Sequence, residues 1–270
     1  MSHEVIAHRD QCLILQDQVS ALIQNTAAVL DADGWATPTN CPPWNITMLV
    51  AHMTRGAESF TAVLQAGLAG DINFTSTPEE RQRRQAELAA MPSAELLATF
   101  VTNQASFREL QQSIGEADLE RYARHPWALQ PLWWFSDQRL AELAFHAWDL
   151  HHSLSQEIDI AANVAQFLMP SIIERNVKAF HKPSPASYGH WLIQATDVEN
   201  GSWMVDPDDG GVAIARTSRE HDIAIQGDAA ALLRWFYGRA NIDALEAEGR
   251  ITLTGARFRV VAWPEMFPAP

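Results

Sequence analysis

The chain has 270 residues, 47% of them hydrophobic and 19% charged, a composition typical of a folded globular protein. At roughly 150 residues per domain, this length favours two domains. Thirty-three acidic residues against 19 basic ones give a net charge of −14, which argues against nucleic acid and anionic membranes as partners. The closest basic group, Arg81, Arg83 and Arg84, lies among glutamates and fits a solvated helix face.

The N-terminal segment has no basic region followed by an apolar stretch, and no run of 18 apolar residues occurs in the chain. We therefore expect a soluble, cytoplasmic protein. The two cysteines, Cys12 and Cys41, are too few for a disulfide framework or a four-cysteine zinc site. Any metal site would have to use histidines and carboxylates.

Apolar residues at helical spacing predict a series of helices in the first 180 residues. The expected helices cover about 10–30, a segment beginning at the N-cap Asn45, and then 93–114, 136–155 and 160–179. No convincing strand separates them. The sequence thus predicts an all-α, up-and-down helical bundle over residues 1–180.

The pattern changes at 180–187, where prolines disfavour helix and predict a linker. Beyond it, short apolar runs between turn signals predict strands at 191–196, 212–215, 222–226, 251–254 and 258–262, with one helix at about 228–238. This grouping of strands with few helices favours a small α+β second domain over 181–270.

A potential metal-binding pair lies in the fourth expected helix. Glu142 and His146 are four residues apart, so they share one helix face, and Asp149 continues the stripe. A third ligand could come from His52, which sits on an otherwise apolar face of the second expected helix. Inward-pointing Glu and His side chains of facing helices are how bundle cores build metal sites.

Each of these residues also has a simpler interpretation. A Glu and a His at this spacing are commonly a surface pair, and a single His on an apolar face is commonly a hydrogen-bonded core residue. Leu143, Phe145 and Trp148 flank the stripe on both sides, however, so the helix is apolar nearly all round. Such a helix is buried, and a buried glutamate needs a partner.

Two segments carry a resemblance to a known family. The stretch 39–52, with its Cys41-Pro-Pro-Trp44 motif, and the stretch 142–150 resemble the mycothiol-dependent maleylpyruvate isomerase family, whose first domain is a DinB-like metal-binding bundle. The segments 227–239 and 251–255 are similar to that family's sterol-carrier-like C-terminal domain. The resemblance implies that His52, Glu142 and His146 are metal ligands. Pro43 departs from the glycine common in the family, which affects the shape of this loop.

Two imidazoles and one carboxylate suit a catalytic Zn²⁺ with an open position, although iron, nickel or manganese would also fit. The resemblance implies a mycothiol-type thiol as cosubstrate and a small, electrophilic, carboxylated substrate such as maleylpyruvate. In the implied isomerisation, a thiolate adds to an activated alkene, the new single bond rotates, and elimination gives the trans isomer. A thiol transferase is an equally consistent outcome, and the protein is expected to be a monomer or homodimer.

Three arginines are candidates for binding substrate carboxylates: Arg55, one turn beyond His52, and Arg234 and Arg239 of the second domain. Each could equally be a surface residue. Cys41 could be a nucleophile, but its setting between prolines and Trp44 at a helix entry favours a small buried hydrophobe.

Further residues near the stripe have open roles. Asp149, His151 and His152 could orient a ligand. A place on the helix surface is an equal alternative for Asp149 and is the favoured interpretation for the two histidines. Trp127, Trp133 and Trp134 could line a pocket or form core. We also expect the site to lie near the junction of the two domains, where pockets are common.

Two other functions remain open at this point. One is a non-catalytic, metal-containing protein that binds a small ligand in its second domain. The other is a metal-dependent hydrolase that uses a bound water and needs no thiol. Dependence of turnover on an added thiol would separate the isomerase from both.

Overall fold

In the computed structural model the chain forms two compact units, residues 1–160 and 161–270. The structure describes residues 2–216 and 219–267. The second unit begins before the linker that the sequence predicts at 180–187, because helix α8 (Ala162–Ser171) packs against helix α10 (Ala229–Phe236) of that unit. Within the described ranges, no helix has the length and apolar character needed to cross a membrane.

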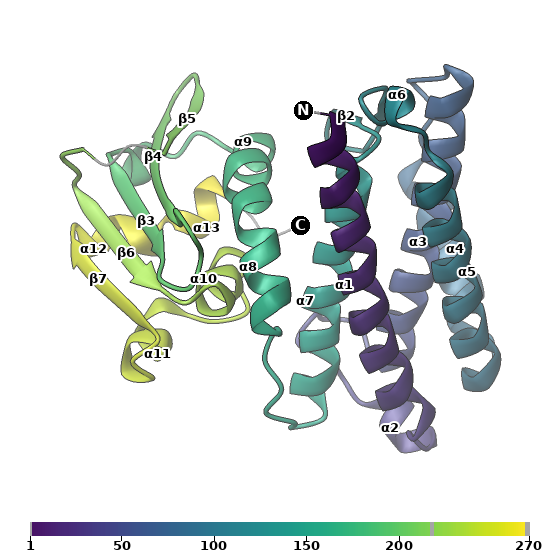
Figure 1. Ribbon diagram of the computed structural model, residues 1–270. Coiled ribbons are helices and arrows are strands. Elements are labelled where there is room, and N and C mark those ends of the chain that lie inside the picture. Colours follow the sequence, from purple (N-terminus) through teal and green to yellow (C-terminus); the bar gives the residue numbers. More distant parts are fainter. Residues whose placement is uncertain (1, 217–218, 268–270) are drawn as a thin grey trace. The chain divides into compact units, whose positions relative to one another are not determined.

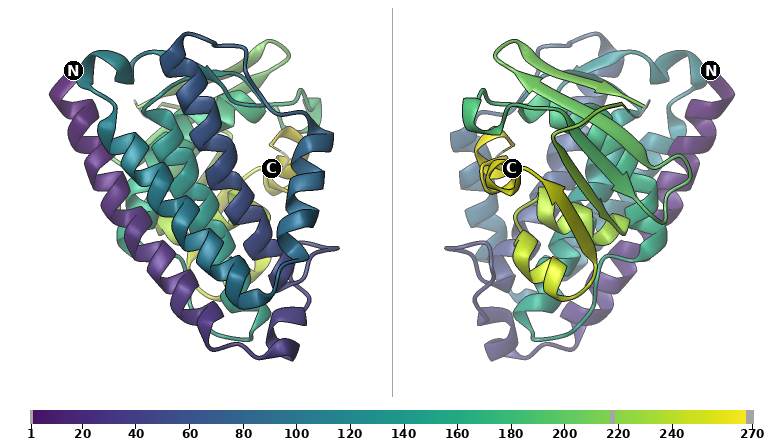
Figure 2. Two further views of the ribbon diagram at one scale, coloured as in Figure 1. Left: turned by 90° about the vertical axis from the view of Figure 1, so that its right-hand side faces the viewer. Right: turned by 90° about the vertical axis from the view of Figure 1, so that its left-hand side faces the viewer.

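Long helices that pack side by side form the first unit, as the predicted bundle requires (Figures 1 and 2). Helix α1 lies against α5 and α7, and α3 lies against α4, α5 and α7. The long helices are α1 (Ser2–Ala28), α3 (Ile46–Ala69), α4 (Pro78–Ala89), α5 (Ser93–Ser113) and α7 (Trp134–Ser153). Short elements connect them: α2 (Ala32–Ala36), α6 (Glu116–Leu119), β1 (Tyr122–Arg124) and β2 (Leu129–Pro131).

Local sequence signals account for several helix ends. The side chain of Asn45 accepts a hydrogen bond from the Met48 amide and caps α3, as predicted. Thr77 and Glu80 form a capping box that starts α4, a helix that the periodicity analysis did not separate. The predicted start of α1 at residue 10 is wrong, since the helix begins at Ser2.

The expectation of no strand in the first unit is also wrong. Strands β1 and β2 pair antiparallel, with Ala123 opposite Gln130. Each strand has only three residues, too few for an alternating pattern to emerge from the sequence.

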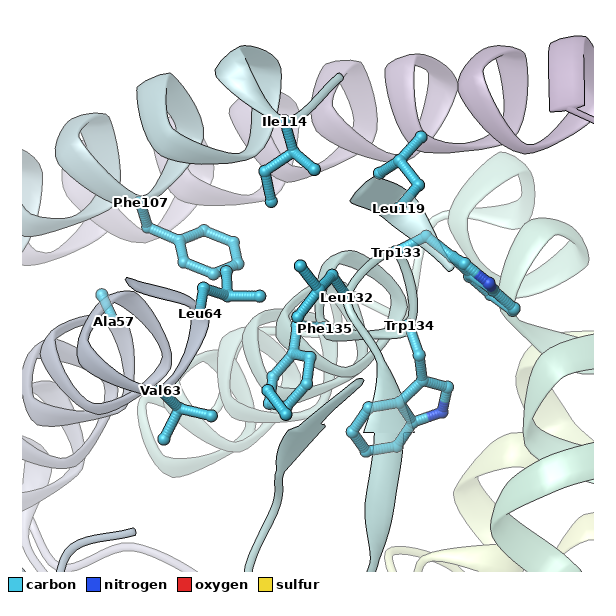
Figure 3. Packing of buried hydrophobic residues seen from close by; sticks show 11 residues of the cluster. Ala57, Val63, Leu64, Phe107, Ile114, Leu119, Leu132, Trp133, Trp134 and Phe135 are labelled. Atoms are coloured by element: carbon cyan, nitrogen blue, oxygen red, sulfur yellow. The ribbon is translucent and has the colours of Figure 1, made fainter. Parts of the chain in front are cut away.

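An apolar cluster fills one part of the bundle (Figure 3). Its buried side chains come from α3, α5, α6, the hairpin and the start of α7, and Phe107, Phe135 and Leu64 are fully buried. A fully buried Leu or Phe stabilises a fold by about 1.5–3 kcal/mol relative to an exposed one. This cluster therefore holds the N-terminal turns of α7 in place.

The second unit is α+β, as predicted. Its sheet has the order β5-β4-β3-β6-β7, in which β3 and β6 are parallel and the other neighbours antiparallel (Figure 2, right). The strands are β3 (Trp191–Ala195), β4 (Ser202–Asp208), β5 (Gly211–Ala215), β6 (Ile223–Gly227) and β7 (Ile251–Gly255). A π-helical turn, Ile172–Asn176, continues α8 into α9 (Val177–Phe180), where the sequence predicts one helix.

Two details of this unit differ from the sequence analysis. Strand β4 was not predicted. Most of the segment 258–262, expected to be a strand, lies in helix α12 (Arg257–Val261). Gly255 has a left-handed φ of 88°, and an added Cβ there would meet the backbone of Asp222, so β7 must end at this residue. Besides the one helix predicted after the linker, this region also contains α11 (Ile242–Ala247), α12 and α13 (Trp263–Met266), which were not predicted.

Candidate metal centre

The three predicted metal ligands face one another inside the first unit. His52 comes from α3, while Glu142 and His146 come from α7, a helix whose residues are buried along almost its whole length. His52 Nε2 lies 3.3 Å from Glu142 Oε1, and the centroids of the His52 and His146 rings are 4.9 Å apart. All three side chains retain some exposure, between 11% and 21%, so the centre is reachable from solvent.

Burial sets the protonation of this pair. Burial lowers the pKa of His52, and the contact with Glu142 only partly offsets that effect. Burial alone would raise the pKa of Glu142, but the charge of Arg139 and the hydrogen bond with His52 outweigh it and hold that pKa below its usual range. The site thus presents a neutral imidazole beside a carboxylate, the forms that bind a metal.

The carboxylate of Glu142 occupies a tight space against helix α3. Arg139 Nη1 donates to Glu142 Oε2 at 2.8 Å. A Cβ added at Gly56 would lie against both carboxylate oxygens and 2.9 Å from Arg139 Nη1. Gly56 therefore provides the room in which the ion pair packs against the backbone of α3.

A second carboxylate orients His146. Its Nδ1 donates to Asp149 Oδ2 at 2.9 Å, and Asp149 is fully buried. Asp149 also accepts from Asn40 Nδ2 at 3.0 Å and from Cys41 Sγ at 3.2 Å. Since Nδ1 carries the proton in this arrangement, Nε2 is left as the ligand atom of His146.

A competing group of potential ligands shares His146. Among the residues that the structure describes, Cys41, His146 and Asp149 are the one set of three whose donor atoms all lie within 4.8 Å of one another. The donor atoms of His52, Glu142 and His146 do not reach that spacing as a set. In the Cys41 group, two of the contacts are hydrogen bonds to one oxygen of Asp149, which explain its close spacing without a metal.

The loop before α3 contributes a wall to the centre. The ring of Trp44 lies 4.7 Å from that of His52 and 6.4 Å from that of His146, centroid to centroid. The backbone amide of Trp44 donates to the carbonyl of Cys41, and the peptide bond between Pro42 and Pro43 is cis. The Cys41-Pro-Pro-Trp44 motif thus places an aromatic face beside the two imidazoles.

Of the three candidate arginines, Arg55 lies beside the centre. Its Nη2 is 3.5 Å from His52 Nδ1, and its Nη1 donates to Ser59 Oγ at 3.3 Å. Arg234 and Arg239 belong to the second unit, where Arg234 pairs with Glu248 and Arg239 donates to the Tyr237 carbonyl. A role for those two at the centre, and a site at the domain junction, stay predictions.

Two expectations for neighbouring residues are wrong. Cys41 is not a buried hydrophobe: it is partly exposed and its thiol donates to Asp149, because this half of the loop faces the polar side of α7. His151 is not on the helix surface but fully buried, bonded to the Ala147 carbonyl and to Thr26. His152 does lie at the surface, stacked on Trp148.

The tryptophans take different places. Trp133 and Trp134 belong to the apolar cluster, while Trp127 in the hairpin is 39% exposed. Two residues that the sequence analysis missed are Arg139 and Asn40. Arg139 extends the Glu142, His146 and Asp149 stripe by one turn, a signal that the sequence did contain. The contact of Asn40 with Asp149 spans 109 residues and had no local signal.

Comparisons with known proteins agree with this fold. A family model described as the mycothiol maleylpyruvate isomerase N-terminal domain matches residues 17–151. Two crystal structures of the mycothiol-dependent maleylpyruvate isomerase, one of them of a mutant, superpose with a TM-score of 0.66 over 91% of this chain and 92% of theirs, at 13% and 12% identity. No curated protein matches the chain. The chain therefore belongs to the mycothiol maleylpyruvate isomerase family.

Proposed function

We propose that the protein is a metal- and thiol-dependent enzyme, an isomerase or thiol transferase for a small electrophilic, carboxylated substrate such as maleylpyruvate. The observation that carries the proposal is the meeting of His52 with Glu142 at 3.3 Å, beside a His146 whose Nδ1 is already bonded to Asp149. Family membership and the fold of the whole chain support the same conclusion at low sequence identity.

The residues present fit a divalent metal held by His52, Glu142 and His146. Two neutral imidazoles and one carboxylate are a ligand set of catalytic zinc, and this set leaves a position open. Iron, nickel and manganese accept the same donors. The hydrogen bond from His146 to Asp149 is the type of outer contact that fixes the ring of a metal-bound histidine. When bound, the metal supplies the positive charge that keeps a thiol in its thiolate form at neutral pH.

The chain's own residues would then bind and orient the two reactants. Arg55, next to His52, is placed to pair with a substrate carboxylate. Arg234 and Arg239 are further candidates, because the substrate of such an isomerase carries two acidic groups. The ring of Trp44 offers an apolar face against which a planar, conjugated substrate can lie.

The proposed reaction needs no redox partner. The sulfur of the thiolate forms a bond to one alkene carbon, and the electron pair of the double bond moves toward the conjugated carbonyl group. Rotation about the resulting single bond is followed by cleavage of the carbon–sulfur bond, which returns the thiolate and leaves the trans alkene. In a thiol transferase the carbon–sulfur bond would persist, and the enolate carbon would take up a proton from solvent.

Turnover with and without a thiol tests this proposal. Zinc-loaded protein is incubated with maleylpyruvate and related electrophiles, together with mycothiol, glutathione or no thiol, and the product is followed by absorbance. We expect turnover only with a thiol, lost in His146→Ala and kept in His152→Ala, a matched change at an exposed histidine of the same helix. Equal turnover without thiol would point instead to a metal-dependent hydrolase. Binding without turnover would point to a ligand-binding protein.

A further inference from the structure

We infer that Arg139 sets the charge of the candidate metal centre: it neutralises Glu142, so a divalent metal keeps its full charge and takes anionic ligands in its open position. The inference rests on the metal site of the proposed function and goes beyond it by assigning a role to a residue that is not itself a ligand. Arg139 is a positioning residue here, since it acts through Glu142.

Arg139 is enclosed completely. Its side chain is 0% exposed, and burying an unpaired guanidinium costs several kcal/mol. Its Nη1 donates to Glu142 Oε2 and its Nε donates to Gln104 Oε1, both at 2.8 Å. Within the described part of the chain, Nη2 has no hydrogen-bond partner. Glu142 is therefore the single carboxylate that this arginine pairs with in the described residues.

Buried amides hold the guanidinium in its orientation. Gln104 Nε2 donates to Gln16 Oε1 at 3.0 Å, and Gln16 Nε2 donates to the Ser136 carbonyl at 2.9 Å. This chain of hydrogen bonds ties α5 and α1 to the start of α7 without introducing another charge. Neutral amides thus orient the guanidinium, and Glu142 is the charged side chain to which it donates a hydrogen bond.

The other charges around the centre come as one of each sign. Asp149 is negative and lies behind His146, and Arg55 is positive and lies beside His52. Glu142 and Asp149 thus supply two negative charges at the centre, and Arg139 and Arg55 supply two positive ones. Removal of Arg139 would leave Glu142 without the cation that pairs with it.

The affinities of the centre for a cation and of the loaded metal for an anion distinguish a change in charge from a loss of packing. With one positive charge removed, the centre should attract a cation more strongly, and the loaded metal should attract an anion less strongly. A substitution that merely loosens the ligands would weaken both. The two affinities therefore distinguish a charge-setting role from a structural one.

The experiment measures zinc affinity by competition with a chromophoric chelator, and azide affinity of cobalt-loaded protein by its visible absorption. For Arg139→Met we expect zinc binding that is tighter by a factor of ten or more and azide binding that is weaker by a similar factor, because one unit charge within about 12 Å changes an affinity at least tenfold at an effective dielectric constant near 20. Arg139→Lys, which keeps the charge, should stay near wild type in both. The matched control is Arg9→Met, another buried arginine, which bonds the carbonyls of Gln111 and Ile114.

Parallel weakening of both affinities, no change in either, or a lysine variant that behaves like the methionine variant would overturn the inference. Arg139→Gln, which retains an amide donor for Glu142, covers the case in which Arg139→Met does not fold. If Arg139→Gln also fails to fold while Arg139→Lys folds, the charge serves folding alone and the inference is wrong. If the wild-type protein binds no zinc, the proposed function itself fails. If the wild-type protein binds zinc and only the Arg139 variants depart from the expected affinities, the inference about Arg139 fails and the proposed function stands.

Discussion

Helix α7 contributes aromatic side chains to the apolar cluster at its start and, further along, the charged residues of the candidate centre. The first turns place Trp134 and Phe135 in the apolar cluster (Figure 3), whereas the later turns carry Glu142, which is 11% exposed, and the fully buried Asp149 with their partners. Apolar burial stabilises the fold directly, while a buried ion pair often gains no more than its desolvation costs. The burial of aromatic side chains at the start of α7, called the apolar end below, is thus explained by its contribution to stability. The burial of the charged group around Glu142, called the charged end below, is better explained by a functional site.

The largest expected effect is at the apolar end. Phe107→Ala removes a fully buried ring from the cluster and should lower the free energy of unfolding by about 3–5 kcal/mol. Its zinc affinity, measured well below the unfolding temperature, should match that of the wild type, because Phe107 belongs to the apolar cluster rather than to the group around Glu142. A large loss of zinc affinity would show that the two ends are not independent.

Gly56→Ala tests the packing of the charged end. Alanine favours a helix by about 1 kcal/mol over glycine, but its Cβ would lie 2.8 Å from Glu142 Oε2. We expect a net loss of about 1–2 kcal/mol in unfolding free energy, measured by urea denaturation, together with weaker zinc binding. Gly115→Ala is the control, because a Cβ there meets nothing within 4 Å. A stabilised Gly56→Ala protein would contradict the tight fit.

The pH dependence of the unfolding free energy should include a contribution from His125, which contacts the apolar cluster. His125 is enclosed by Phe60, Trp134 and Phe135, and burial lowers its pKa from 6.5 to about 3. Since the unfolded chain takes up this proton and the folded protein does not, stability falls as the pH drops below 6.5. From pH 7 to pH 5 this histidine should remove about 2 kcal/mol.

His125→Phe removes that contribution, so its unfolding free energy should fall less than that of the wild type between the same two pH values. The exposed His152 supplies the control, and His152→Gln should keep the wild-type slope. Equal slopes for wild type and His125→Phe, measured by chemical denaturation, would show that His125 is not held neutral by burial.

The sequence predicted the fold well where the pattern was long. Apolar spacing and capping chemistry, which act locally, correctly predicted helices α5 and α7 and the N-cap Asn45. The pattern failed where context decides. Strands β1 and β2 are too short to show a period, and residues 257–261 leave the sheet because Gly255 turns the chain.

The candidate site divides in the same way. The spacing of Glu142 and His146 on one helix was readable, and His52 was noticeable as a polar residue on an apolar face. Arg139 lies on the same stripe, about one turn before Glu142, and was overlooked there. Asn40 depended on its contact with Asp149, 109 residues along the chain. Such contacts are products of the tertiary fold, and single-sequence patterns do not contain them.

We propose that a metal binds to His52, Glu142 and His146 rather than to the group of Cys41, His146 and Asp149. Elemental analysis of zinc-loaded, dialysed His52→Ala and Cys41→Ser proteins tests it most directly, because each variant removes a ligand of one group only. Serine can keep the hydrogen bond that Cys41 donates to Asp149. The account predicts one metal per chain in wild type and Cys41→Ser, and none in His52→Ala. Metal retained in His52→Ala but lost in Cys41→Ser would contradict it.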